Sequence, residues 1–320
     1  MTKRKRQPRR PTTAGVIACL VCGVLLAAAS YLIDAFGGLY GLPGWEQLYA
    51  WLGIPMDTPS AEMLQTGDAT VTFFDVGQGD SVLIACGEDT CLIDAGTPDA
   101  ADSLVAALQT AGVRRLDYLV MTHPHADHIG GMAQVLEAFP VEHFYMGPET
   151  QNTSCYADML EALEIQGIQP VVPSDGDVLS FGSGATVTFL GPADDVPADN
   201  LNNRSLIALF STGAQRVLFM GDAESAAEQS LLAHHPDLSC DILKVGHHGA
   251  ATSSSEEFLR TIHPSVAVIS CGIDNDYGHP SDQTLQNLSL AGVDDVRITA
   301  EDSTVVLPLN PPSQSKENAA

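Results

Sequence analysis

The chain has 320 residues, of which 45% are apolar, so it is long enough to bury a sizeable core. Its 14 basic and 40 acidic residues give a net charge of −26, and six of the basic residues lie in the first ten positions. The remainder has eight basic against 40 acidic residues, a charge of −32. This charge excludes a general nucleic-acid coat protein, which needs Lys and Arg to neutralise phosphates, but not a nuclease that uses metal ions.

An apolar segment without charge follows the basic N-terminus, over residues 14–33. Twenty helical residues span about 30 Å, the thickness of a bilayer core, and preceding basic residues favour a cytoplasmic N-terminus. We therefore expect a basic cytoplasmic tail over 1–13, a single transmembrane helix over 14–36 and an extracellular remainder. Small residues at 27–30 leave a cleaved signal segment, and hence a secreted protein, as the alternative.

A linker rich in Gly and Pro is expected over 37–68, and a disordered tail over 310–320. Between them, short β-branched runs alternate with helical stretches, which predicts one α/β domain with two sheets and helices outside. The predicted strands are 71–74, 82–84, 91–93, 118–121, 187–190, 206–210, 217–220, 241–245 and 266–270. The predicted helices are 101–111, 132–138, 156–166, 223–234 and 255–261.

Two cysteines flank the turn between the second and third predicted strands. Cys86 and Cys91 could face each other across this hairpin and form a disulfide in an exported protein. Two small apolar residues at strand ends are the alternative.

A dense group of metal-ligand residue types follows the strand 118–121. His123, His125, Asp127 and His128 lie within six residues, and their close approach is favourable mainly when a cation holds them together. Imidazole and carboxylate ligands suit zinc, and also manganese or iron where oxygen ligands share the site.

This HxHxDH segment resembles the metal-binding signature of the metallo-β-lactamase fold. Further motifs in the same order are similar to the hydrolase domain of the ComEC competence proteins: FDVGQGDS at 74–81, LIDAG at 92–96, NNRS at 202–205, MGD at 220–222, LKVGHHG at 243–249 and YGHP at 277–280. The resemblance covers about residues 69–309. It implies that the domain folds as an αββα sandwich. It also implies that the chain is a stand-alone, membrane-anchored relative of those proteins.

The resemblance also implies a pair of divalent metal ions, with zinc expected and manganese as the alternative. His123 and His125 would hold one ion, Asp222 would bridge, and the second ion would be held by Asp127, His128 and His279. A bridging carboxylate screens the repulsion between two dications about 3.5–4 Å apart. The NNRS segment stands where many members of the fold supply a further His. Three alternatives therefore remain for the first ion: weaker binding, a site that holds a single metal in total, or a preference for a harder ion such as manganese.

Several further residues have candidate roles. One of His247 and His248 is expected to point into the site as a ligand or as the acid for the leaving group, and we favour His247. Lys244 is either a solvated strand residue or a phosphate clamp. The other candidates are Asp127 for catalysis besides metal binding, Asn203, Ser205 and His248 for substrate binding, and Asp80 and Asp94 as partners of ligating His or as turn caps.

These residues predict a metal-dependent hydrolase in which metal-activated water attacks the substrate. The resemblance favours phosphodiester bonds and DNA first, although the acidic body would need a local basic channel. The alternatives are an esterase acting on cell-wall phosphodiesters, a small lactone or lactam hydrolase, and a membrane-tethered metal-binding subunit without activity. A groove lined by Arg204 and Lys244 would favour nucleic acid, and a closed pocket near Tyr277 a small or wall-derived substrate.

Overall fold

The computed structural model describes residues 69–309. The predicted basic tail, transmembrane segment, linker and C-terminal tail lie outside these residues. Within the described part of the chain, none of the helices is both long and apolar enough to cross a bilayer.

The first sheet has six strands in the order β13-β1-β2-β3-β4-β5. The hairpin strands β1 to β3 and the edge strand β13 are antiparallel, whereas β3, β4 and β5 run parallel. The bounds are β1 Ala69–Phe73, β2 Val82–Cys86, β3 Asp89–Ile93, β4 Leu116–Met121, β5 Val141–Met146 and β13 Val305–Leu309.

The second sheet has seven strands in the order β12-β11-β10-β9-β8-β7-β6. Its strands β9 to β12 run parallel, and β6 to β9 are antiparallel. The bounds are β6 Val178–Ser180, β7 Thr186–Gly191, β8 Ile207–Ser211, β9 Arg216–Phe219, β10 Ile242–Lys244, β11 Val266–Ile269 and β12 Asp295–Ile298.

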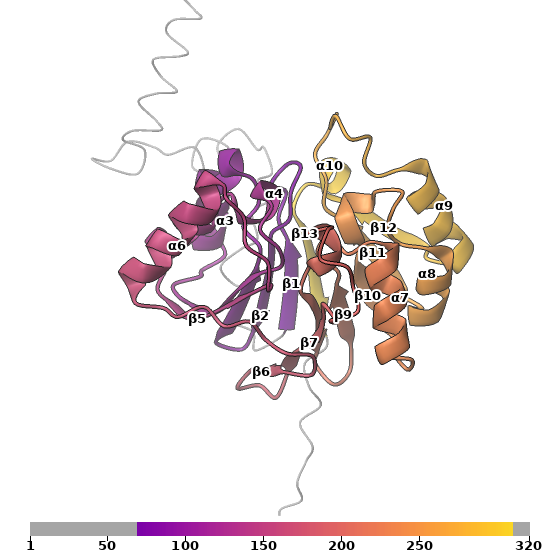
Figure 1. Cartoon of the computed structure of the whole chain (residues 1–320), viewed down its shortest axis with the longest axis horizontal. Helices are drawn as coiled ribbons and strands as arrows, with labels where there is room; N and C mark the ends of the chain where they lie inside the picture. Colours follow the sequence, from indigo (N-terminus) through magenta and orange to yellow (C-terminus); the bar gives the residue numbers. More distant parts are fainter. Residues whose placement is uncertain (1–68, 310–320) are drawn as a thin grey trace, which may run out of the picture. The chain divides into compact units, whose positions relative to one another are not determined.

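Helices cover the outer faces of the two sheets, which gives the α/β/β/α layering seen in Figure 1. Helices α3, α5 and α6 pack on the first sheet, and α7, α8 and α9 on the second. The bounds of the α-helices are α3 Ala101–Thr110, α4 Ala126–Ile129, α5 Met132–Ala138, α6 Ser154–Gln166, α7 Ser225–His234, α8 Glu256–Ile262, α9 Asp282–Ala291 and α10 Thr299–Asp302. Short 3₁₀ turns are η2 Pro98–Ala100, η3 Asn202–Arg204 and η4 Gly246–Gly249.

Side chains that alternate in direction along each strand divide the hydrophobic core into a layer between the sheets and layers beneath the helices. In β2, Val82 and Ile84 point between the sheets, where they join Phe189 and Phe210 of the second sheet, whereas Leu83 points to the helices. Successive side chains of a strand point to opposite faces, so one short apolar run serves both layers. The predicted α/β fold with two sheets and outer helices is confirmed, and each predicted strand and helix is present, most of them with shifted ends.

The predictions did not include β5, β6, β12, β13, α9 and the short helices α4 and α10. The edge strand β13 contains Pro308, which weakens a strand signal, and it pairs with β1 from the far end of the domain. Of the two alternatives for Cys86 and Cys91, the structure supports small apolar residues at strand ends rather than a disulfide. Cys86 lies opposite Asp89 and Cys91 opposite Ile84 in the hairpin register, so the two free thiols do not face each other.

Candidate metal centre

The predicted ligands meet where strands of both sheets end. The HxHxDH segment follows β4 in the first sheet, whereas Asp222 follows β9 and the two adjacent His follow β10 in the second. Parallel strands end at the same edge of a sheet, so the loops after them converge on one site. The short helix α4 carries Asp127 and His128, which turns both toward this edge.

Two groups of ligand atoms share Asp222. His123, His125 and Asp222 form one group, in which one ligand atom from each residue lies within 4.8 Å of the others. The second group, under the same limit, consists of Asp127, His128, Asp222 and His248. A carboxylate common to two such groups is the arrangement that a bridging ligand between two ions requires.

Three of the facing atoms of the second group are buried and lack other partners. His128 Nε2 lies 3.2 Å from Asp222 Oδ1, and His248 Nε2 lies 3.3 Å from Asp127 Oδ2 and 3.5 Å from Asp222 Oδ1. His128 Nε2, His248 Nε2 and Asp222 Oδ1 have no partner in hydrogen-bond geometry. Buried polar atoms are otherwise almost always hydrogen-bonded, so this donor set of imidazole nitrogens and carboxylate oxygens fits divalent metal ions.

The far side of each imidazole in this group is fixed by an acceptor. Asp94 Oδ2 lies 2.7 Å from His128 Nδ1, and the carbonyl oxygen of Ser270 lies 2.9 Å from His248 Nδ1. Because both oxygens only accept, each Nδ1 carries a proton, which leaves Nε2 as the atom through which each ring would bind a metal ion. Asp94 also accepts hydrogen bonds from the backbone and hydroxyl of Thr122. Its contact with His128 is the one that the predicted partner role requires.

The charges of the cluster depend on one another. Burial lowers the pKa of His123 well below its usual value, and the neighbouring His128 lowers it further. Burial also lowers the pKa of His128, but Asp222 and Asp94 raise it more strongly, to well above the usual value. For Asp222, burial raises the pKa, and His128 and His248 outweigh this and hold it well below its usual value. The shared carboxylate is therefore ionised, as metal binding requires.

Lys244 lies behind the site rather than in it. Its side chain is buried, and Nζ lies 2.7 Å from Asp80 Oδ2 and donates to the carbonyl oxygen of Val245. Asp80 Oδ1 is 3.3 Å from Nδ1 of His248, so Asp80 connects the lysine to a candidate ligand. Burial raises the pKa of Asp80, but Lys244 and His248 lower it to below its usual range. These contacts correct both readings of Lys244: it is neither solvated nor placed to clamp a phosphate.

His247 takes a different position from its neighbour. Its Nδ1 lies 3.0 Å from Glu224 Oε1, and its Nε2 lies 3.2 Å from the amide nitrogen of Asn202. Both His247 and His248 have a left-handed backbone, with φ values of 47° and 54°. Left-handed backbone is strained in residues other than Gly and is found mainly at functional sites. It turns the two adjacent imidazoles toward different parts of the same cavity.

Two residues predicted to bind substrate are buried and bind the backbone that carries Asp222 and Glu224. Ser205 Oγ accepts a hydrogen bond from the backbone of Asp222 and lies 3.3 Å from Nδ1 of His123. Asn203 accepts hydrogen bonds from the backbone of Glu224 and Ala227. Neither side chain lines the cavity, so the structure places Asn203 and Ser205 behind the site rather than at its surface. Their neighbour Asn202, which was not among the predicted site residues, lines the cavity instead.

His279 and His248 exchange their expected positions. His279 lines the cavity but belongs to neither ligand group, and its Nδ1 lies 3.4 Å from Gln78 Nε2. His248, predicted to bind substrate, is buried within the second group. The sequence HHG does not show which of two adjacent residues turns inward, because this depends on the left-handed backbone there.

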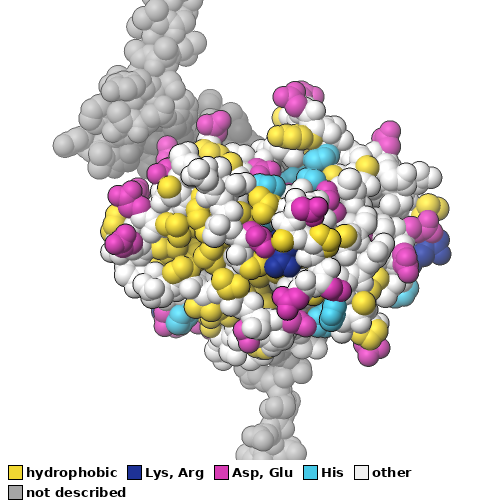
Figure 2. All heavy atoms as spheres, viewed as in Figure 1, with side chains coloured by type: hydrophobic (Ala, Val, Ile, Leu, Met, Phe, Trp, Pro, Cys, Tyr) yellow, Lys and Arg dark blue, Asp and Glu magenta, His cyan; other side chains and the backbone are white. Residues whose placement is uncertain are grey.

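An open cavity of about 370 Å³ is lined in part by residues of both metal-ligand groups. Its lining consists of Gln78, His125, Ala126, Asp127, Asn202, Asp222, His247, His248, Tyr277 and His279. This set contains neither Lys nor Arg. On the face shown in Figure 2, acidic side chains are spread widely and basic ones appear at few places. The residues around this cavity thus provide no basic channel.

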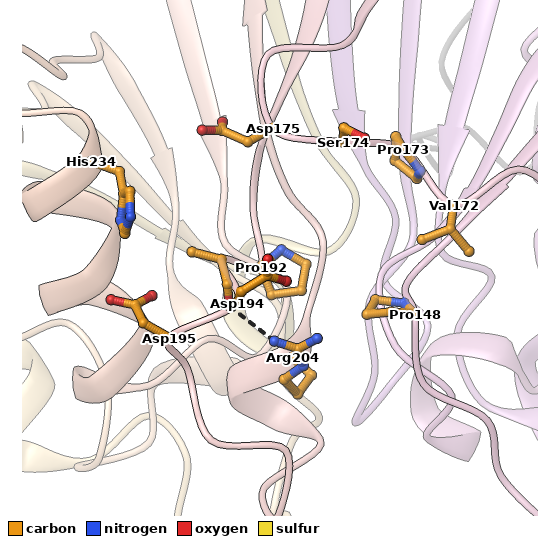
Figure 3. A pocket seen from close by; sticks show the side chains of 11 residues that line it. Pro148, Val172, Pro173, Ser174, Asp175, Pro192, Asp194, Asp195, Arg204 and His234 are labelled. Carbon is orange, nitrogen blue, oxygen red and sulfur yellow. Dashed lines mark hydrogen bonds between the residues drawn. The ribbon is translucent and has the colours of Figure 1, made fainter.

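Arg204 belongs to a separate cavity of about 460 Å³, shown in Figure 3. Its guanidinium pairs with Glu149 at 3.0 Å and donates to the carbonyl oxygen of Ala193 at 2.9 Å. Asp194 and Asp195 also line this cavity. Because Lys244 is buried, the described residues form no groove lined by both Arg204 and Lys244, the feature that would have favoured nucleic acid.

Comparison with known proteins shows the class to which this site belongs. Residues 74–273 match the Metallo-beta-lactamase superfamily, and the chain belongs to that superfamily. The solved metallo-beta-lactamase fold protein YhfI of Bacillus subtilis superposes with a TM-score of 0.51 at 14% identity, covering 76% of this chain and 100% of that one. This likeness shows the fold alone.

The curated relatives are more specific. The chain is 30% identical over 241 residues to ComE operon protein 3 of Bacillus subtilis (strain 168), covering 70% of this chain and 31% of that protein. It is 33% identical over 285 residues to competence protein ComA of Neisseria gonorrhoeae, covering 88% of this chain and 38% of that protein. The predicted family resemblance is confirmed, and the chain spans about a third of the length of these relatives.

Proposed function

We propose that this chain is a two-metal phosphodiesterase that acts on DNA. The observation that carries the proposal is Asp222, which lies in both ligand groups. Bound divalent ions, zinc or manganese, would supply an activated water nucleophile and neutralise charge that develops on the phosphate. DNA is preferred as the substrate because the relatives are named competence proteins.

The chain's own residues would hold the ions and manage the proton. His123, His125 and Asp222 would hold one ion, whereas Asp127, His128, Asp222 and His248 would hold the other. Asp94 and the Ser270 carbonyl keep the ligating nitrogens aimed at the site. We assign His247 as proton donor to the leaving group, since it lines the cavity outside both groups and Glu224 accepts from its Nδ1. The transferred proton would leave from Nε2, which lies beside the side-chain amide of Asn202.

A small or cell-wall phosphodiester is the second candidate substrate. The observation in its favour is the cavity lining, which has Tyr277 at its edge and contains neither Lys nor Arg. A body with a charge of −32 repels a long polyanion, and a small substrate needs fewer basic contacts.

The test uses the full chain, stripped of metal and reloaded with zinc or manganese. We expect hydrolysis of bis(p-nitrophenyl) phosphate and of labelled single- or double-stranded DNA, loss of both in Asp127→Ala, and retention in the exposed control Asp102→Ala. Cleavage of the small diester without DNA would favour the second candidate. Inactivity on every substrate with metal bound would contradict the proposal and favour a metal-binding subunit.

The location of the domain is part of the proposal. The apolar segment 14–33 and the preceding basic residues support a single-pass membrane protein with an extracellular domain. Protease added to intact cells should digest residues 69–309. Their protection in intact cells but not in lysed cells would contradict this topology.

A further inference from the structure

The loop after β11 exposes two large apolar side chains to solvent, and one of them lies at the metal cavity. Ile273 and Tyr277 are 77% and 73% exposed, and Tyr277 lines the cavity itself. Such exposure gives up the free energy of burying these side chains in the core. An exposed apolar residue is ordinary elsewhere on a surface, but Tyr277 is exposed while it lines a polar site, which indicates a contact surface.

This loop is held in place by its own hydrogen bonds. The side chain of Asn275 donates to the carbonyl oxygens of Gly272 and His279 and accepts from the backbone N–H of Tyr277 and of His279. Gln78 accepts from the backbone of Gly272, at a point where even a Cβ on that glycine would lie 2.9 Å from the Gln78 nitrogen. The exposed ring of Tyr277 is therefore presented on a fixed backbone.

The ring of Tyr277 continues a series of imidazoles that begins in the metal centre. Tyr277 and His279 lie 5.7 Å apart with an interplanar angle of 25°, and His279 and His248 lie 6.3 Å apart at 23°. These near-parallel rings lead from a candidate ligand to the rim of the cavity, which is formed by the loop 272–279. A flat ring placed against the exposed Tyr277 would extend the series while its attached phosphate reaches the cavity.

The charges at the rim favour recognition by a ring rather than by phosphate contacts. Asp274 and Asp276 are exposed on either side of Asn275, so their carboxylates would repel any further phosphate groups of a substrate at the rim. Stacking needs no charge, and every nucleobase has a face that can stack.

We propose that Tyr277 is a stacking subsite for an aromatic or heteroaromatic ring, of the nucleobase type, joined to the reacting phosphodiester. This inference rests on the proposed function and adds to it how the substrate is recognised. A single rigid ring suits a flat partner, whereas a quaternary ammonium group is held by a cage of several rings. Tyr277 thus selects substrates by the group beside the phosphate.

The test compares three diesters with the same p-nitrophenol leaving group: the p-nitrophenyl esters of thymidine monophosphate, methyl phosphate and phosphorylcholine. We expect the metal-loaded full chain to prefer the thymidine ester to the methyl ester in kcat/KM. Tyr277→Ala should reduce this preference roughly tenfold, mainly through KM, and Tyr277→Phe should keep it. Ile165→Ala, which removes a side chain that is 78% exposed on α6, should leave the preference unchanged.

A binding measurement separates this inference from the proposed function. Calorimetric titration with thymidine monophosphate should show roughly tenfold weaker binding in Tyr277→Ala than in the wild type. Equal affinity in the two proteins, equal loss of activity on all three esters, or a preference for the choline ester would overturn the stacking subsite. Failure to hydrolyse any ester would contradict the phosphodiesterase, and the titration would still test Tyr277.

Discussion

The metal cavity has a buried wall and an exposed rim that are built in opposite ways. We define the wall as the six buried residues Asp80, Asp94, His128, Asp222, Lys244 and His248, all nearly inaccessible to solvent, and the rim as the loop 272–279. The wall is made of strand ends and ionised groups that pair with one another. The rim is a loop closed by the hydrogen bonds of a single amide side chain.

This difference assigns the metal binding and catalysis to the wall, and the recognition of the substrate to the rim. Groups in the wall have their orientation fixed from two sides, as for His128 between Asp94 and Asp222. Fixed dipoles and charges need no rearrangement during a reaction, which is how a site is prepared for catalysis. The rim contacts the wall through His279 and exposes Ile273 and Tyr277. We expect changes in the wall to affect metal binding and stability, and changes in the rim to affect KM.

The largest effect is expected for Asp222→Asn. The variant removes the charge that both ligand groups share, so we expect kcat/KM to fall on the order of a thousandfold or more. Metal content measured by mass spectrometry should fall together with activity. The exposed control Asp237→Asn should retain both. Full metal content with full activity in Asp222→Asn would remove the distinction between wall and rim.

Lys244→Met should give the largest loss of stability. The variant leaves Asp80 buried without its cation, and breaking a buried ion pair on one side typically costs about 3–5 kcal/mol. Denaturant unfolding of the chelator-treated protein measures this loss. The double variant Asp80→Asn/Lys244→Met removes both charges and should recover part of it. A loss in Lys244→Met no larger than in the double variant would show that this pair contributes little to the wall.

Metal removal should cost less than the broken ion pair. An ion at a hundred times its dissociation constant stabilises the native state by about 2.7 kcal/mol, so chelation should lower the melting temperature of the wild type. Chelation should have little effect on the melting temperature of Asp222→Asn. A wild-type melting temperature that is independent of chelator, zinc and manganese would contradict a metal site in the wall.

Several candidate metal ligands were predictable because they are close together in the sequence. His123, His125, Asp127 and His128 lie in one short segment after a strand, so their proximity needs no knowledge of the fold. Asp222 was predicted from its family motif. The sheet order was less accessible, because β13 pairs with β1 across most of the domain.

The roles of the remaining site residues depend on their burial and on the local direction of the backbone, which a sequence pattern does not specify. Ser205 and Asn203 are polar residues in a motif, and only the packing shows that they face the backbone of Asp222 and Glu224. Lys244 has the sequence environment of a solvated or substrate-binding lysine, yet it is buried against Asp80. Tyr277 was expected only as a neighbour of a small-substrate pocket, and its stacking on His279 became visible in three dimensions.

The smallest effect is expected at Asn275 and tests whether the rim acts separately from the wall. Asn275→Ala removes the hydrogen bonds that close the loop, which should destabilise the protein by about 1–2 kcal/mol, less than Lys244→Met. The looser loop should raise KM for the thymidine ester with little change in kcat, because the ligand groups contain no residue of this loop. Asn275→Asp keeps the acceptor for Tyr277 and His279 but loses both donated bonds, so its KM should lie between those of wild type and Asn275→Ala. Steady-state kinetics at saturating metal separates the two constants. A fall in kcat or metal content as large as in the wall variants would show that rim and wall form one unit, because the ligand geometry would then depend on the loop.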